Sequence, residues 1–189
     1  MGINKGAYDE KNILAVMLAS ACGLSAMSAN AADGTITFNG QITDTTCDVA
    51  LSSPGATSGT DLVVELGAFH KAKIANANDI VSEKDVKFSL SNCPTAITKV
   101  GILFEGTQDN DMQDAFANTA AGADAAVGVA VKLMDGASAV APNSLPVLKD
   151  ISNGTLEIPY KAQFVATKSN ADLTAGKYTT TVNYTMNYQ

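Results

Sequence analysis

The clearest pattern in this chain is an alternation of two kinds of position over residues 176–189. Large side chains and one threonine take every second place, and threonine or asparagine fills the places between. The first set comprises Tyr178, Thr180, Val182, Tyr184, Met186 and Tyr188. A period of two predicts a long β-strand with one buried face. Because the pattern continues to the last residues, we expect an earlier strand or another chain to cover its open edge.

A second alternating stretch lies toward the other end, over residues 35–43. Ile36, Phe38 and Ile42 share one face with Gly40, where the missing side chain leaves room for close approach of another backbone. Between the two ends the pattern predicts further short strands, over residues 62–66, 86–90, 99–105, 127–134, 145–148 and 156–166.

Turn-rich and polar stretches separate these strands. Residues 52–59 read as a loop, residues 71–79 as a loop or short helical turn, and residues 106–122 as a polar, alanine-rich segment. Pro159 indicates that the strand over residues 156–166 is bent or at a sheet edge. Seven or eight short strands without a convincing helix predict an antiparallel β-sandwich in one domain.

Charge composition argues against a nucleic-acid partner. The chain has 189 residues and a formal net charge of -7, and all 12 of its cationic residues are lysine. Arginine supplies much of the contact to phosphates and guanine in nucleic-acid complexes. We therefore expect no nucleic acid among the partners.

The first residues resemble an export signal, predicted over residues 1–31. Lys5 and Lys11 precede an apolar run, and Ala29 and Ala31 fit the small-residue rule for cleavage after Ala31. The alternative is a short membrane anchor, but the strongly apolar part is too short to span a bilayer.

Cysteine usage agrees with export. Cys22 would leave with the signal, so the mature chain keeps Cys47 and Cys93. Two cysteines in an exported protein are expected to form a disulfide. Two buried free thiols are the alternative. A metal site is disfavoured because two cysteines and the lone His70 make no recognisable ligand set.

Residues for catalysis are nearly absent. His70 has no neighbouring serine or cysteine motif. Asp109, Asp111 and Asp114 imitate a calcium loop but lack the spaced glycine and the glutamate of an EF-hand. No glycine-rich phosphate loop is present. The sequence predicts a protein that is not an enzyme and needs no cofactor.

Three features together resemble one family. Residues 32–42, followed by Cys47, resemble the N-terminal extension and first strand of chaperone–usher pilus subunits of the type 1 fimbrial kind. At the other end, Tyr188 matches that family's penultimate aromatic residue and Gly176 its glycine fourteenth from the end. The Cys47 and Cys93 pair matches its single disulfide, and the resemblance covers residues 32–189.

The resemblance implies an all-β, incomplete immunoglobulin-like sandwich that lacks its last strand and is completed by a donor strand from another chain. It divides the chain into a signal peptide (1–31), a donor-strand extension (32–44) and a pilin domain (45–189). The implied donor residues are Ile36, Phe38, Gly40 and Ile42. The implied acceptor-groove and chaperone-contact residues are Gly176, Tyr178, Val182, Tyr184, Met186, Tyr188 and Gln189, whose carboxylate would anchor the chaperone.

The expected function is that of a structural subunit of an adhesive surface filament, assembled by donor-strand exchange, and most simply the major shaft subunit. The expected partners are copies of itself or related subunits, a periplasmic chaperone and an outer-membrane usher. The expected route leads through the periplasm to the cell surface. Two alternatives stay open: a minor or adaptor subunit, and a self-complete secreted β-sandwich that binds a ligand.

Overall fold

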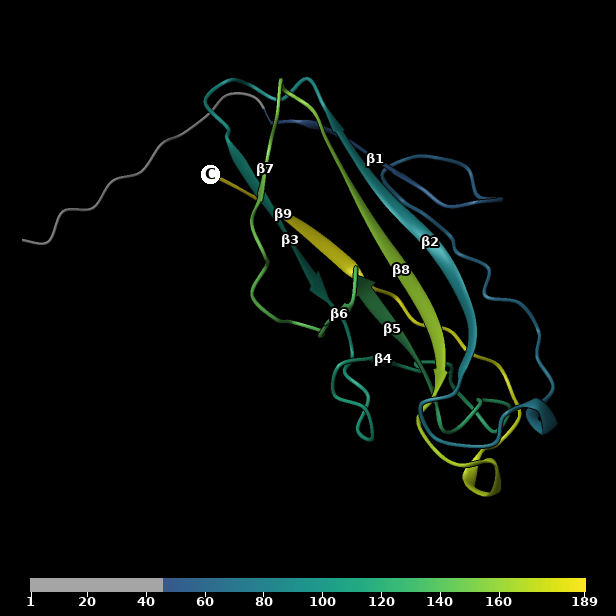
Figure 1. Ribbon diagram of the computed structural model, residues 1–189. Helices are drawn as coiled ribbons and strands as arrows, with labels where there is room; N and C mark the ends of the chain where they lie inside the picture. The colour runs from purple at the N-terminus through teal and green to yellow at the C-terminus, as the bar shows by residue number, and fades with distance from the viewer. Residues whose placement is uncertain (1–45) are drawn as a thin grey trace, which may run out of the picture. The chain divides into compact units, whose positions relative to one another are not determined.

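The computed structural model describes residues 46–189 (Figure 1). The predicted signal peptide and the predicted donor-strand extension, with its residues Ile36, Phe38, Gly40 and Ile42, lie outside the described residues.

The described residues form strands joined by loops and two single-turn 3₁₀ helices. The strands are β1 (Asp48–Ser52), β2 (Ile80–Ser91), β3 (Lys99–Glu105), β4 (Phe116–Ala117), β5 (Val129–Asp135), β6 (Ser138–Val140), β7 (Lys149–Asp150), β8 (Leu156–Ala166) and β9 (Asn183–Tyr188). The 3₁₀ helices are η1 (Lys71–Lys73) and η2 (Asn170–Asp172). This composition confirms the all-β prediction. Over residues 46–189, no helix is long and apolar enough to cross a membrane.

The strands form two antiparallel sheets. The larger has the order β1-β2-β8-β5-β4, with β6 paired to β5, and the smaller has the order β7-β3-β9. In Figure 1 the long strands β2 and β8 run side by side, in agreement with their register from Ile80 opposite Val165 to Leu90 opposite Leu156.

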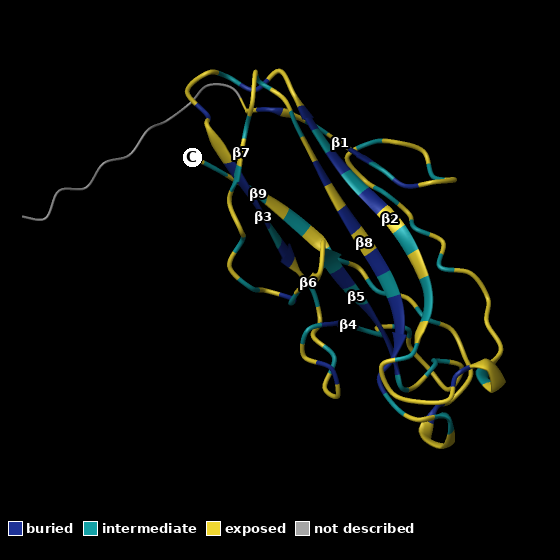
Figure 2. Ribbon diagram, viewed as in Figure 1, coloured by how far each residue is buried: buried dark blue, intermediate teal, exposed yellow. Residues whose placement is uncertain are grey.

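Aromatic side chains join the two sheets into a sandwich. Phe88 on β2 meets Phe104 on β3 edge to face, with ring centroids 5.8 Å apart. Phe104 meets Tyr160 on β8 in the same way at 5.1 Å. Edge-to-face pairs of this kind stabilise a core beyond the area that they bury. Figure 2 shows the resulting alternation of buried and exposed positions along β8.

Strand β3 has the bounds that the sequence predicts, and most of its apolar residues are buried. Gly101 at its centre allows a close approach from the segment before β7. A side chain there would place its Cβ 2.9 Å from the Cβ of Pro146 and 3.2 Å from a methyl carbon of Leu148. Because both faces of β3 are covered, its side chains are apolar without interruption from Val100 to Phe104.

The prediction for Pro159 needs a correction. Strand β8 is an inner strand of the larger sheet, paired with β2 on one side and with β5 on the other. The pairing with β5 begins only at Lys161, so Pro159 faces β2 alone, opposite Lys87. A proline has no N–H to donate to a ladder. It is tolerated at this position because β8 has a neighbouring strand on one side only there.

Two short elements also differ from the prediction. Residues 145–148 form no strand; the two-residue strand β7 follows them, and Leu145 and Val147 are exposed. Strand β4 lies within the polar stretch over residues 106–122, where its two residues are too few to produce a recognisable pattern.

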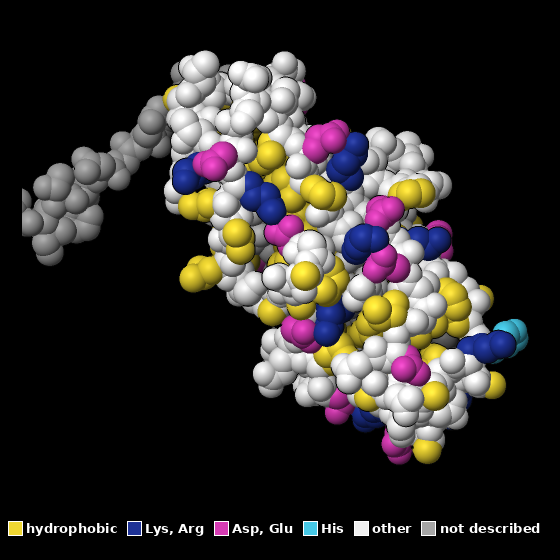
Figure 3. Space-filling model, in the orientation of Figure 1, with side chains coloured by type: hydrophobic (Ala, Val, Ile, Leu, Met, Phe, Trp, Pro, Cys, Tyr) yellow, Lys and Arg dark blue, Asp and Glu magenta, His cyan; other side chains and the backbone are white. Residues whose placement is uncertain are grey.

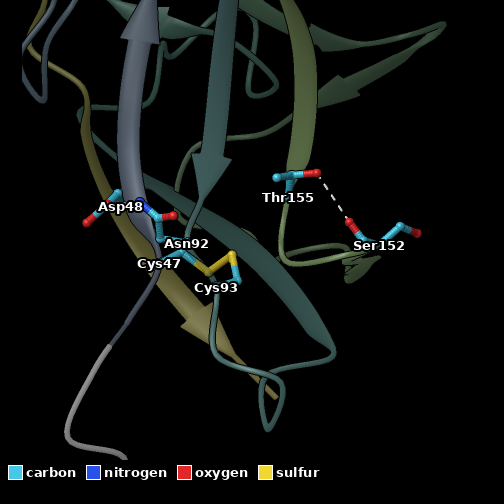
Figure 4. The surroundings of a disulfide bond; sticks show 6 residues. All are labelled: Cys47, Asp48, Asn92, Cys93, Ser152 and Thr155. Atoms are coloured by element: carbon cyan, nitrogen blue, oxygen red, sulfur yellow. Dashed lines mark hydrogen bonds between the residues drawn. A yellow bond between two sulfur atoms is a disulfide. The ribbon is translucent and has the colours of Figure 1, made fainter.

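The predicted disulfide between Cys47 and Cys93 is present and ties the chain before β1 to the chain after β2 (Figure 4). Two hydrogen bonds hold the same corner. The Asn92 side-chain amide donates to Asp48 at 2.7 Å, and the Cys93 N–H donates to the Gly154 carbonyl at 3.0 Å. Since 46 residues separate the cysteines, loop closure predicts a stabilisation of about 4 kcal/mol.

We predict that replacing both cysteines (Cys47→Ser with Cys93→Ser) lowers the free energy of unfolding by about 4 kcal/mol, through greater entropy of the unfolded chain. Denaturant titration of the mature protein measures this loss. The unaltered protein treated with a reductant is the matched control and should unfold at the same denaturant concentration as the double variant. An unchanged midpoint in both samples would contradict the prediction.

Candidate functional site

A long groove with a volume of about 1170 Å³ opens between two extended segments. We call residues 60–69 the N-terminal wall and residues 173–184 the C-terminal wall. Core side chains from both sheets form the floor, and they include Phe88, Phe104, Phe116, Val131, Leu133 and Phe164. An apolar floor of this length, bordered by two extended backbones, has the dimensions of a site for a third extended segment.

The N-terminal wall has the side-chain pattern of a strand but no ladder. Leu62, Val64 and Leu66 are half-buried, and the residues between them are exposed. Within residues 46–189, the backbone of residues 61–69 makes no hydrogen bond to another backbone group. The strand predicted over residues 62–66 is therefore wrong as a hydrogen-bonded element, because its pattern is present without a pairing partner.

The C-terminal wall leads into β9, which among the described strands pairs only with β3 and lies at the edge of the smaller sheet. Tyr178, Thr180, Val182, Tyr184, Met186 and Tyr188 are half-buried, and the residues between them are exposed. Figure 2 shows this alternation along β9. The alternation that the sequence predicts is therefore confirmed.

Hydrogen bonds at the end of β9 determine which backbone groups face the open edge. Gln189 and Lys99 exchange a pair of backbone bonds of 2.9 and 2.8 Å. Hydrogen-bonded pairs recur at every second residue of an antiparallel ladder, so the odd-numbered residues of β9 bond to β3. The N–H and C=O groups of Tyr184, Met186 and Tyr188 consequently point away from β3, toward the free edge.

The predicted C-terminal strand is longer than β9 because β3 ends at Glu105, opposite Asn183. Along the wall that precedes β9, loop residues replace β3 as hydrogen-bond partners. Lys177 donates its N–H to the Asp124 carbonyl at 2.7 Å, and its own carbonyl accepts from the N–H of Ala126 at 2.9 Å. The wall thus stays extended outside the ladder.

Gly176 permits this close contact with the loop. A Cβ at that position would lie 2.6 Å from the backbone nitrogen of Ala126. Real Cβ atoms do not approach a backbone so closely, so only glycine fits without movement of the loop.

A hydrogen bond spans the groove at each end. The Tyr184 hydroxyl donates to the Thr60 carbonyl at 2.9 Å, while its ring lies edge to face on Phe88 at 5.1 Å. At the other end, the Lys71 ammonium donates to the Leu173 carbonyl at 2.6 Å. Burial, with a smaller contribution from Asp61, raises the pKa of Tyr184 above its ordinary value.

Backbone groups at the beginning of β3 bind Gln189. The main-chain oxygen of Gln189 accepts hydrogen bonds from the N–H groups of Thr98 and Lys99, at 2.7 and 2.8 Å. These bonds fasten the end of β9 to the beginning of β3. The contact of the Gln189 carboxylate with a chaperone stays a prediction.

The structure brings most of the predicted acceptor residues to one site. Tyr178, Val182 and Tyr184 line the groove, with Gly176 at the start of the same wall. Met186 and Tyr188 continue the half-buried face beyond the groove and pack against the core.

Sequence reasoning missed the opposite wall and the floor. The alternation over residues 62–66 gave the correct side-chain pattern for the N-terminal wall. No local signal reveals that this wall lies across from residues 173–184, because the two are far apart in the sequence.

The other candidate residues show no site. His70 is exposed beside η1, and Figure 3 shows the histidine side chain projecting from the surface. The Asp109 carboxylate accepts hydrogen bonds from the N–H groups of Asp111 and Met112, each at 3.0 Å. Asp114 forms a salt bridge with Lys132 at 2.9 Å. In the described part of the chain, no three histidine, cysteine, aspartate or glutamate residues gather as metal ligands.

Sequence comparison identifies relatives over nearly the whole chain. The family model described as "Fimbrial protein" matches residues 36–189. The major fimbrial subunit SMF-1 of Stenotrophomonas maltophilia is 33% identical, with 86% of this chain and 96% of that protein covered. Long polar fimbria protein A of Salmonella typhimurium is 31% identical, with 95% and 97% covered.

Solved structures of pilus subunits share the fold, which supports the immunoglobulin-like architecture. The P pilus rod subunit PapA superposes with a TM-score of 0.61 at 16% identity, over 77% of this chain and 100% of that chain. A subunit in the structure of a chaperone–usher pilus superposes with a TM-score of 0.59 at 20% identity, over 84% and 96%.

These findings agree on one class of protein. The relatives are structural subunits of fimbriae, and they are not enzymes. The chain belongs to the fimbrial protein family, whose subunits form fimbriae on the cell surface.

Proposed function

We propose that this subunit polymerises by accepting, in its groove, a β-strand from the N-terminal extension of a neighbouring subunit. One observation carries the proposal: two walls face each other across a shared apolar floor, and within residues 46–189 the backbone groups that they turn toward the groove have no backbone partner. A strand laid between them would bond to both walls and cover the floor. Addition of a strand to an open edge is a common mode of peptide recognition.

The chain carries a segment suited to this site at its other end. Ile36, Phe38 and Ile42 alternate with polar residues over residues 32–44, so one face of an extended strand would enter the groove. Burial of each large side chain contributes about 1.5–3 kcal/mol. Gly40 on the same face would fit where a wall comes closest to the inserted backbone.

Head-to-tail contact explains how such subunits make a filament. The donor segment and the groove are different surfaces of one chain, so each copy would both give and receive a strand. An interface of this kind does not close on itself in a pair, and repetition of it yields an open polymer.

An empty groove requires protection before assembly. Its floor is apolar, and the wall backbone groups that face it have no backbone partner within the described residues, which together form a hazard for aggregation. A periplasmic chaperone that lends a strand would cover both, and an outer-membrane usher would then direct the exchange. The role as major shaft subunit is supported by the likeness to SMF-1, a major fimbrial subunit.

We predict that deletion of residues 32–44 from the mature chain abolishes polymerisation and leaves a folded domain that still accepts a donor. Electron microscopy and sedimentation measure filament length. Added in small amounts to the full-length subunit, the deletion variant should shorten filaments, because it can receive a strand and cannot give one. Collapse of the deleted chain into unfolded material would instead favour a self-complete sandwich.

We predict that lysine prevents polymerisation at one position of the C-terminal wall and has no effect on it at the adjacent position. Val182→Lys places a charge in the apolar groove and should prevent filament formation, because an unpaired charge is costly to bury. Thr181→Lys adds the same charge on the exposed side and should polymerise like the unaltered subunit.

Circular dichroism and formation of the Cys47–Cys93 disulfide test whether both lysine variants fold. Equal polymerisation by two folded variants would contradict a strand-binding role for the groove.

A further inference from the structure

We infer that Asn118 is a positioning residue of the groove, whose side chain holds the C-terminal wall extended and ready to receive the donor strand. The inference rests on the proposed function and adds a residue that is remote from the wall in sequence.

The Asn118 side-chain amide binds four backbone groups. Its nitrogen donates to the carbonyls of Ala126 and Lys177, each at 2.8 Å. Its oxygen accepts from the N–H groups of Ala120 and Thr179, each at 3.0 Å. Both donor hydrogens and both acceptor positions of the amide are therefore in use.

These bonds replace a strand that is absent at this point. Strand β3 ends at Glu105 and reaches the chain only from Asn183 onward. Lys177 is instead bonded to the backbone of Asp124 and Ala126 and to Asn118. The Thr179 N–H donates to Asn118, and the Thr179 carbonyl accepts from the N–H and hydroxyl of Thr119 at 2.7 and 2.9 Å. Side-chain bonds thus continue the β3 edge beyond its end.

The consequence appears on the other side of the wall. Backbone groups of successive residues in an extended segment point in opposite directions. With Lys177 and Thr179 fixed inward, the N–H and C=O groups of Tyr178 and Thr180 point toward the groove. Without Asn118, the Thr179 N–H would lose its partner and the Lys177 carbonyl one of its two donors, so part of the ordering of this wall would fall on strand capture, at an entropic cost.

Gly176 and Asn118 act on the same contact. The glycine lets the loop at Ala126 approach the wall, and the amide bonds to both the Ala126 and the Lys177 carbonyls. This pairing gives a physical reason for a glycine at the start of the wall.

Capture of a labelled donor peptide tests the role of Asn118. A fluorescent peptide of residues 32–44 is added to the mature, disulfide-bonded chain, and anisotropy gives the association rate. Asn118→Ala should slow capture about tenfold, the effect of losing one or two net hydrogen bonds. Asn187→Ala is the matched control, since Asn187 is exposed on β9, and it should capture at the unaltered rate.

Hydrogen exchange separates positioning from general destabilisation. In Asn118→Ala the amides of residues 177–181 should exchange faster, and those of β9 should not change. Asn118→Asp keeps the acceptor oxygens and loses the donors, so it should capture at an intermediate rate and retain protection of the Thr179 amide.

Four results would overturn the inference. A folded Asn118→Ala variant that captures the peptide at the unaltered rate would do so, and so would faster exchange throughout the domain. If Asn118→Ala does not fold, a folded Asn118→Asp variant that captures the peptide at the unaltered rate would also overturn the inference. Failure of the unaltered chain to capture any peptide would remove the proposed function itself, and the inference with it.

Discussion

Backbone hydrogen bonding along the two walls of the groove is the constraint on which the rest of this structure depends. An extended chain must place its N–H and C=O groups on a partner or in water. On the C-terminal wall the inward groups are bonded to β3 and to the loop around Asn118, while the outward groups face the groove. On the N-terminal wall the backbone has no such ladder within the described residues. The apolar floor between them favours a strand over water.

The remainder of the domain holds this open site in shape. Phe88, Phe104 and Tyr160 join the two sheets beneath the groove through edge-to-face contacts. The disulfide fixes the corner where β1 and β2 meet. Hydrogen bonds from Tyr184 and Lys71 span the groove at its two ends. Contacts that hold a groove open before binding lower the ordering cost of binding, which is the usual advantage of preorganisation.

Periodicity in the sequence predicted the parts of the fold that depend on local pattern. The bounds of β3 and β8, the alternation through Tyr188 and the cysteine pair follow from side-chain spacing and chemistry. Pairing partners did not follow, because a period of two says which face is buried and not which segment lies alongside. The pattern over residues 62–66 therefore predicted a strand where the structure has an unpaired wall. The four bonds of Asn118 were equally hidden, since an asparagine in a polar stretch gives no signal of its distant partners.

Cysteine cross-linking between subunits tests most directly whether a neighbour's extension fills the groove. One chain carries a cysteine on the donor face (Phe38→Cys) and a second carries one in the groove (Val182→Cys), with neighbouring donor positions included to cover the register. The account predicts disulfide-linked pairs that join the two different chains within filaments. A chain that carries both cysteines, stays monomeric and cross-links only to itself would contradict it.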